Sequence, residues 1–548
     1  MALSRRGGSG SRNRAGGRGS NRGSRGRGGG FSSNDPPPNR VPLPESFQSW
    51  ARHNRHPGLA LDKFAKSVSS TGEALSKISE NIQRPTIEEV VRLTRSFSPK
   101  LYQRLLDRQM RLWETVQAVT FVGRTDGPVT LHLARASSLE NAGIALHRIY
   151  GLPSLPATGL KGLARAYAET VWFPAQFRAD QDRVPVNEQA HKDAEHAWRR
   201  IETVFGWSPG SDRHKSYKPR SLAEPATDAS AGAVVFHDAW CTDVPKLEAD
   251  ILNNHHRSYY DGESQPTGPP GDWDDPVPVY FLTLAPRQTF RFALSLRRPD
   301  IDSASLTEAL TLAHQWLIGG LAMLGAGAKT NAGYGAFTFS SDSVPEDVLQ
   351  QALAPWKTAE QLGRRKIRRI EVELVTPAFL AGAEQFGQNA RFGCDMRPAT
   401  VRGLLRWWWR TLHAGFLTVK QLRELESTIF GDTKEAGALQ VRVTTAHAPT
   451  GQAQLFDFKD WSPGKDGRPP RRATKPRPDF RKQFQLLPTP NPQTTQGLFY
   501  AAYGMDDAPG NDAMKRRYFR HPGQRWTIEL IARPVCLRGR DDKSLSAD

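Results

Sequence analysis

The sequence has few cysteines and no long apolar run. Its 548 residues include three cysteines, Cys241, Cys394 and Cys536, which lie far apart and form no CxxC pair. This spacing argues against a disulfide framework and a structural zinc site, and we expect a cytoplasmic location. No stretch approaches the roughly 18–20 apolar residues of a membrane-spanning helix, and the arginine-rich start lacks the apolar core of a secretory signal. We therefore expect no membrane partner.

Two familiar catalytic patterns are also missing. Residues 325–335 read GAGAKTNAGYG, but Ala328 precedes Lys329 where a nucleotide-binding phosphate loop requires glycine. No HExxH or HxxxH pattern occurs among the 14 histidines. The sequence therefore predicts neither an ATPase nor a metal site, and we expect no cofactor.

The balance of charge is strongly basic. The formal net charge is +19 and the isoelectric point is near 10, which favours polyanionic partners, nucleic acid before an anionic membrane surface. Residues 1–40 hold nine arginines and one acid, Asp35, among Gly, Ser and Asn. We expect residues 1–44 to be disordered, serving either as an RNA-binding tail or as a solubilising one. A third basic feature is an expected exposed loop at 463–482, with eight basic residues and five prolines.

A short phrase occurs twice. Residues 156–165 read PATGLKGLAR and residues 398–406 read PATVRGLLR, so a basic residue precedes a glycine in both (Lys161-Gly162 and Arg402-Gly403). An arginine follows three residues after each glycine, and VFG at 204–206 and IFG at 429–431 come later in the same order. The order predicts a duplicated module. A glycine beside a cation where a helix begins suits close approach of a phosphate.

The periodicity of apolar residues predicts an α+β fold in two modules. We expect a first module over 45–341 with a helical lead-in at 45–118, a polar linker with a short helical stretch at 342–366, and a second module over 367–548. Helices are expected at 188–205, 303–324 and 420–430, a β-hairpin at 277–296, and Thr158 as a helix cap.

The second phrase opens a helix with three arginines on one face. Arg402, Arg406 and Arg410 are four residues apart, with no acid in that stripe, and Trp409 flanks it. Uncompensated cations of this kind indicate nucleic-acid contact more than an ordinary solvated face. We expect Trp407 and Trp408 to anchor the helix in the core.

The glycine-rich loop at 325–335 has two interpretations. Its backbone, with Gly327 and Gly333 beside Lys329 and Tyr334, can seat an RNA strand and stack a base. A tight turn between helix and strand explains the same residues, and the two interpretations are compatible. The predicted RNA-contacting residues are Lys161, Gly162, Arg165, Gly327, Lys329, Gly333, Tyr334, Arg402, Gly403, Arg406, Trp409 and Arg410.

Several motifs together resemble a known family. The stretches HRIYGLPSLPATGLKGLAR, VFG, GAVVFHDAW, NNHHRSYY and GAGAKTNAGYGAF are similar, in this order, to the sixth Cmr subunit of type III-B CRISPR effectors, a RAMP protein. The stretches VELVTPAFLAGA, RPATVRGLLRWWWR and ELESTIFG resemble the N-terminal half of the first Cmr subunit. The chain thus resembles a fusion of two RAMP subunits.

The resemblance implies a fold, a function and partners. It implies tandem ferredoxin-like (RRM-like) modules that bind guide RNA non-catalytically, capping the end of an antiviral complex that holds the 3′ part of the guide. It also implies contact with target RNA, the backbone RAMP subunit, the small subunit and the large cyclase subunit. The sequence departs from the family because no second glycine-rich loop closes the second module.

Two other functions stay open. A metal-independent endoribonuclease maturing guide RNA could use His147 or His255 as a general base, although a structural role is more common for such histidines. A general RNA chaperone would depend on the arginine-rich tail.

Overall fold

The structure is a computed structural model that describes fourteen stretches of the chain. These are residues 45–65, 80–131, 143–176, 188–208, 229–260, 268–299 (except 272 and 275), 303–383 (except 377, 379 and 381), 395–432, 436–445, 452–454, 518–520, 523–533, 536–538 and 544–546. The arginine-rich tail and the basic loop at 463–482 lie outside them. None of the described helices combines the length and hydropathy needed to cross a bilayer.

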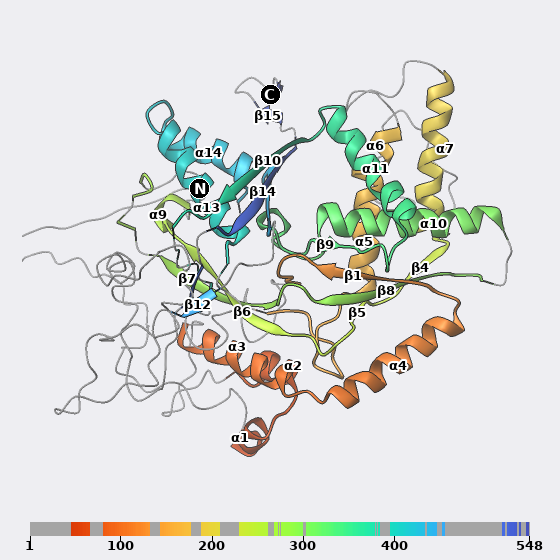
Figure 1. Cartoon of the computed structure of the whole chain (residues 1–548), viewed down its shortest axis with the longest axis horizontal. Coiled ribbons are helices and arrows are strands. Elements are labelled where there is room, and N and C mark those ends of the chain that lie inside the picture. Colours follow the sequence, from red (N-terminus) through yellow and green to blue (C-terminus); the bar gives the residue numbers. More distant parts are fainter. Residues whose placement is uncertain are drawn as a thin grey trace, which may run out of the picture.

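The lead-in is helical, as predicted. Its helices are α1 (Glu45–Arg52), α2 (Pro57–Asp62), α3 (Glu80–Arg95) and α4 (Pro99–Thr115). Both α2 and α4 begin at a proline, whose missing N–H is not needed in a first turn. In Figure 1, α4 lies below the first sheet, and the Tyr102 hydroxyl of α4 donates 2.8 Å to the Cys241 carbonyl of that sheet.

The first sheet is antiparallel and has five strands. Its order is β4-β8-β1-β9, and β5 also pairs with β8. The strands are β1 (Val119–Thr125), β4 (Val234–Phe236), β5 (Trp240–Cys241), β8 (Thr289–Leu296) and β9 (Phe337–Thr338).

Helices cover the other face of this sheet (Figure 1). They are α5 (Ala157–Tyr167) with the π-turn η1 (Ala168–Trp172), α6 (Phe173–Gln176), α7 (Glu188–Phe205), and α10 (Ala304–Gly319) with the π-turn η2 (Gly320–Leu324). Tyr167, Trp198 and Trp316 are fully buried between them. The predictions for 188–205 and 303–324 are confirmed, but α5 begins after Pro156, so the prediction of Thr158 as its cap is wrong.

The predicted β-hairpin at 277–296 is also wrong. Its two strands form, but β7 (Val277–Leu284) pairs with β6 (Leu247–Asn254), whereas β8 pairs with β1. Alternating apolar residues predict a strand without naming its partner. The short elements β2 (Gly206–Trp207), β3 (Ser230–Ala231), α9 (Arg257–Tyr260) and η3 (Thr330–Ala332) complete this part.

A long helix occupies the expected linker. The helix α11 (Glu346–Gln361) packs against α10, and its Trp356 is 4% exposed within the main core. The Tyr167 hydroxyl donates 2.6 Å to the Ala352 carbonyl of α11. Residues 346–361 therefore belong to the packed core.

A second antiparallel sheet follows, with the order β10-β14-β11. Its strands are β10 (Lys366–Glu373), β11 (Leu439–Thr445) and β14 (Arg525–Ala532), with α13 (Pro398–His413) and α14 (Val419–Phe430) between β10 and β11. Two small pairs lie apart, β12 (Gln452–Gln454) with β13 (Tyr518–Arg520) and β15 (Cys536–Arg538) with β16 (Ser544–Ser546). The described chain is thus α+β with antiparallel sheets.

The repeated phrases occupy matching places. The first opens α5 and the second opens α13, while the phenylalanines of VFG and IFG, Phe205 and Phe430, end α7 and α14. In each half a strand precedes these two helices and two paired strands follow.

Candidate nucleic-acid interface

The arginines of α13 meet a buried carboxylate. Arg406 forms an ion pair with Glu426 of α14, and Arg410 Nη1 lies 2.9 Å from Glu426 Oε1. Glu426 is 0% exposed. The prediction that this stripe lacks a compensating acid is therefore wrong, because the acid comes from the neighbouring helix and not from α13.

Two tyrosines complete this cluster from the first half of the chain. The hydroxyls of Tyr259 and Tyr260 donate to the two oxygens of Glu426 at 2.8 and 2.6 Å. Burial alone would raise the pKa of Glu426, but Arg406, Tyr260 and Arg410 together hold it below its ordinary value. Burial and the nearby carboxylate raise the pKa of Tyr259. The cluster therefore joins the two halves through one ionised carboxylate.

Arg402 has a different environment. Its guanidinium donates to the Phe430 carbonyl and lies 5.8 Å from the centre of the Phe430 ring. No described residue accepts a hydrogen bond from its buried Nε. Burial, with repulsion from Arg406, lowers the pKa of Arg402 to about 10. Arg402 is thus the α13 arginine whose charge no described carboxylate neutralises.

The glycine-rich loop contacts the second half of the chain. The amide of Asn331 donates 2.9 Å to the Gly437 carbonyl, and Gln440 donates 3.2 Å to the Thr330 carbonyl. A Cβ on Gly333, whose φ is +80°, would lie 2.5 Å from Pro398 at the start of α13. The loop therefore has a structural role at this junction, which the sequence did not predict. It also connects η2 to β9, as the alternative interpretation of a turn between helix and strand expected.

Tyr334 and Lys329 point inward from the same loop. Tyr334 is 4% exposed, and its hydroxyl donates 2.5 Å to Asp250, which also pairs with Arg397. Lys329 Nζ lies 4.9 Å from the centre of the Phe281 ring, and burial lowers its pKa although Asp250 opposes this. In this arrangement the Tyr334 ring has no face open for a base. The backbone at Gly327 is also closely packed, because a Cβ there would lie 2.2 Å from the Thr130 carbonyl oxygen.

The opening of α5 is more accessible. No described carboxylate pairs with the Lys161 ammonium, whose pKa is lowered by burial and by the nearby Arg297 and Arg165. Arg165 Nε lies 2.7 Å from Glu169 of the same helix. Gly162 is exposed, and a Cβ there would meet no atom within 4 Å. Lys161 and Gly162 are therefore free to contact a ligand.

Gly403 on α13 matches Gly162. It is exposed and has no atom within 4 Å of a built Cβ. The arginines three residues after these glycines also have similar surroundings. Arg165 lies 5.9 Å from the centre of the Phe205 ring, and Arg406 lies 5.8 Å from the centre of the Phe430 ring. The structure thus brings Arg402, Arg406 and Arg410 together on α13, and places Lys161 with Arg165 on α5.

The tryptophans of α13 differ from expectation. Trp408 is 55% exposed, so the prediction that it anchors α13 in the core is wrong. Trp407 is half-buried with its ring perpendicular to that of Trp408, and Trp409 stacks on His413 at 4.6 Å.

The two candidate histidines have different surroundings. His147 Nδ1 accepts the backbone N–H groups of Ile149 and Tyr150 at 3.2 and 3.4 Å, and burial lowers its pKa. His255 is exposed, with its ring 6.0 Å from that of His256. No group of three or more potential metal ligands occurs among the described residues.

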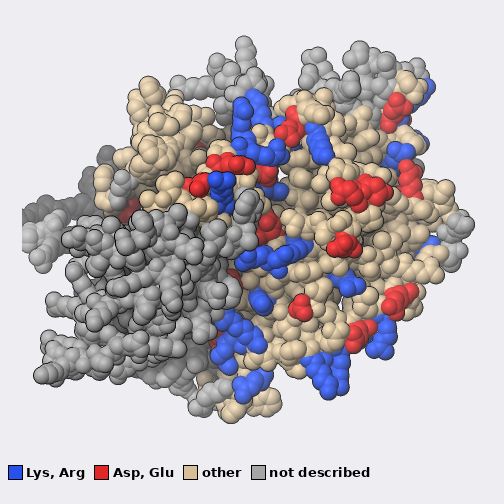
Figure 2. Space-filling model, viewed as in Figure 1, with Lys and Arg blue, Asp and Glu red and all other residues tan. Residues whose placement is uncertain are grey.

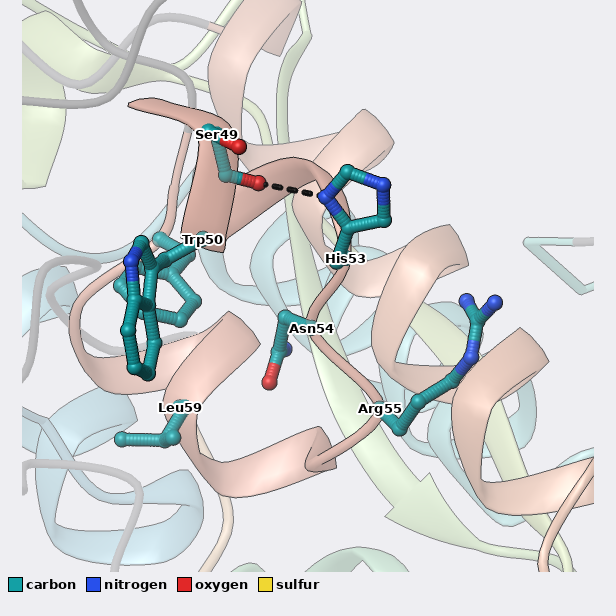
Figure 3. Close-up of a pocket in the computed structure, with 7 residues that line it drawn as sticks. Ser49, Trp50, His53, Asn54, Arg55 and Leu59 are labelled. Atoms are coloured by element: carbon teal, nitrogen blue, oxygen red, sulfur yellow. Dashed lines mark hydrogen bonds between the residues drawn. The ribbon is translucent and has the colours of Figure 1, made fainter. Parts of the chain in front are cut away.

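The described residues of the face seen in Figure 2 form no single basic path. Figure 2 shows Lys and Arg side chains interleaved with Asp and Glu over the described part of the face in view. A hollow of about 480 Å³ lies beside α1 and α2, where Trp50 and Arg55 form opposite walls and His53 Nδ1 bonds to the Ser49 carbonyl (Figure 3). None of the predicted RNA-contacting residues lines this hollow.

Comparison with known proteins gives consistent matches. The chain is 26% identical over 328 residues to the CRISPR system Cmr subunit Cmr6 of Pyrococcus furiosus, covering 54% of this chain and 91% of that protein. It is 32% and 34% identical over 72 and 74 residues to the subunits Cmr1-1 and Cmr1-2 of the same organism, which covers 21% and 36% of their lengths.

Solved structures give weaker fold matches. One is the type III-B Cmr-beta complex bound to cognate target RNA, at 18% identity and a TM-score of 0.29, covering 48% of this chain and 75% of the other. Another is the crystal structure of Cmr6 from Pyrococcus furiosus, at 26% identity and a TM-score of 0.22, covering 41% and 97%. Both TM-scores are below 0.5, so the assignment depends on sequence. The RAMP superfamily matches residues 71–338 and again residues 371–543, and the chain belongs to this superfamily.

Proposed function

We propose that this chain is a guide-RNA-binding subunit of a type III-B CRISPR complex, without nuclease activity of its own. The observation that carries the proposal is the match to 91% of the Cmr6 sequence. The short matches to Cmr1 proteins support a Cmr1-like second half, and hence a fusion. The net charge of +19 supports a polyanionic partner.

We also propose a fold for each half, a place in the complex and a set of partners. Each half is a ferredoxin-like module, which the order β4-β8-β1-β9 of the first sheet supports. The subunit caps the end of the complex that holds the 3′ part of the guide. Its partners are guide and target RNA, the backbone RAMP subunit, the small subunit and the large cyclase subunit.

The RNA contact is assigned first to the second turns of α5 and α13, which contain Lys161–Gly162 and Arg402–Gly403. Glycine inside an exposed helix costs about 1 kcal/mol relative to alanine. Neither Gly162 nor Gly403 has a neighbouring atom within 4 Å that would require it. A ligand backbone that lies against each helix explains both glycines, with Lys161 and Arg402 beside them. Sequence would be read by base pairing of the guide and not by these side chains.

Two experiments test this function. The tagged chain is purified from its host, and its RNA and proteins are identified. We expect short RNAs with a common repeat-derived tag and other Cmr subunits; ribosomal or random RNA would contradict the proposal. Lys161→Ala should reduce the slope of the logarithm of the binding constant against the logarithm of the salt concentration by about one. Lys357 is an exposed lysine on α11, and Lys357→Ala should leave this slope unchanged.

A nuclease assay separates this proposal from its alternative. The chain is incubated with precursor guide RNA in EDTA, beside His147→Ala and His255→Ala variants. We expect intact RNA in all samples. Specific cuts that vanish in either variant would favour the endoribonuclease instead.

A further inference from the structure

An exposed arginine directly follows one strand in each half of the chain. These residues are Arg297 after β8 and Arg533 after β14. The phrases GAVVF at 232–236 and GALQV at 437–441 contain the starts of the neighbouring strands β4 and β11. The residue before each arginine pairs with the third residue of its phrase. The two arginines therefore occupy the same position in the two sheets.

Similar hydrogen bonds hold both arginines in place. The backbone N–H of each donates to the carbonyl of the alanine in its phrase, at 2.8 Å for Arg297 and 3.2 Å for Arg533. The Arg297 Nε also donates 2.9 Å to the Gly232 carbonyl, and the Arg533 Nη2 donates 2.7 Å to the Ala436 carbonyl. No carboxylate of the described residues pairs with either guanidinium.

In the first half this arginine lies near the helix cation Lys161. Burial lowers the pKa of Lys161, and repulsion from Arg297 and Arg165 lowers it further. Glu169 pairs with Arg165, but no described carboxylate pairs with the other two cations. Cations that repel one another at an accessible position are stabilised when an anion binds between them.

In the second half the arginine lies beside a backbone contact that Arg402 also reaches. A Cβ on Gly437 would lie 2.3 Å from the carbonyl carbon of Phe430. Arg402 donates to the Phe430 carbonyl oxygen, and the Arg533 Nη2 lies 3.5 Å from the Gly437 carbonyl oxygen. Arg402 and Arg533 therefore donate to carbonyls on the two sides of one close contact.

The carbonyl contacts account for only part of each guanidinium. An arginine side chain has five N–H donors in a planar fork, and this fork matches two oxygens of a phosphate. Because Arg297 and Arg533 are exposed, their remaining donors are accessible to a ligand. A side chain that is already held in position also loses less conformational entropy when it binds.

We propose that Arg297 and Arg533 are equivalent phosphate-binding residues. Each holds a backbone phosphate of the RNA strand beside the helix cation of its own half, Lys161 or Arg402. This inference rests on the proposed RNA-binding function and adds to it two residues that lie outside the repeated helix phrases. The contact involves charge and shape and reads no base.

Modification of arginines by phenylglyoxal tests the inference on the unaltered chain. The modified peptides are quantified by mass spectrometry, with and without a single-stranded RNA of the co-purified guide sequence. We expect RNA to prevent modification of Arg297 and Arg533, and to leave modification of Arg104, an exposed arginine of α4, unchanged. Protection of other arginines without these two would overturn the inference and leave the RNA-binding function standing. Failure of the chain to bind this RNA at all would contradict the function itself.

Substitutions give an independent measurement. Arg297→Ala and Arg533→Ala should each reduce the slope of the logarithm of the binding constant against the logarithm of the salt concentration by about one, and the double variant by about two. Arg297→Lys and Arg533→Lys should restore the slope because the charge is kept, and Arg104→Ala should not change it. A residue that only anchors a carbonyl would lower the thermal midpoint without changing the slope, and that result would overturn the inference.

Discussion

The Tyr260 hydroxyl and the Glu426 carboxylate are joined by a 2.6 Å hydrogen bond although 166 positions separate them. The bond connects α9 of the first half to α14 of the second, and Arg410 bridges both groups at 2.9 Å. The arginines that the sequence assigns to RNA therefore hold the two halves together. This position assigns Arg406 and Arg410 a structural role whether or not RNA lies nearby.

Removing the Glu426 carboxylate should lower the free energy of unfolding. Glu426→Ala leaves two guanidiniums and two phenols buried without their shared acceptor, and breaking a buried pair in this way costs about 3–5 kcal/mol. We expect that loss in urea-induced unfolding. Glu424→Ala, an exposed glutamate on the same helix, should change the free energy of unfolding by less than about 0.5 kcal/mol. Equal effects of the two substitutions would contradict the cluster.

The same carboxylate predicts a dependence on pH. The pKa of Glu426 is lowered in the folded chain, whereas an unfolded glutamate has a pKa of about 4.3. Its stabilisation is therefore complete well above pH 4.3 and is lost as the pH falls through the lower folded value. The difference in unfolding free energy between wild type and Glu426→Gln should shrink from pH 7 towards pH 3. A difference that stays constant over this range would exclude an ionised, paired Glu426.

The glycine-rich loop should be sensitive to a single methyl group. Gly333→Ala adds a Cβ that would lie 2.5 Å from Pro398, at a φ of +80°. Gly363→Ala meets no atom within 4 Å at a φ of +70°, so it isolates the conformational cost of roughly 1–2 kcal/mol. We expect Gly333→Ala to destabilise the chain by more than Gly363→Ala in thermal unfolding. Similar losses would show that the loop does not contact α13 closely.

Replacing the exposed glycines of α5 and α13 by alanine should stabilise the chain, in contrast to Gly333→Ala. Gly162→Ala and Gly403→Ala should each stabilise the chain by about 0.5–1 kcal/mol, because alanine is the better helix former and a Cβ meets no atom. The same substitutions should weaken binding of guide RNA, which filter binding measures. Gly415→Ala, in open space beyond the end of α13, serves as the control for binding. Stabilisation without weaker binding would remove these glycines from the RNA contact.

Local patterns predicted much of the fold. The helices at 188–205 and 420–430 correspond to α7 and α14, and both repeated phrases open helices as expected. Helical periodicity and a proline at the helix start are properties of a few adjacent residues, so one sequence suffices to find them.

Apart from the cap of α5, which lies at Pro156 and not at Thr158, the misplaced interpretations concern partners that are distant in the chain. Charge on one face of α13 could be counted, but the position of Glu426 relative to that face depends on how α13 and α14 pack. Exposure of Trp408 likewise depends on whether a second helix covers α13.

The central claim is that the second turns of α5 and α13 contact one RNA strand, and ultraviolet cross-linking of the co-purified guide RNA tests it most directly. Mass spectrometry of the RNA-linked peptides should identify residues of α5 near Lys161 and of α13 near Gly403. Cross-links confined to the arginine-rich residues 1–44, with neither helix represented, would contradict the account.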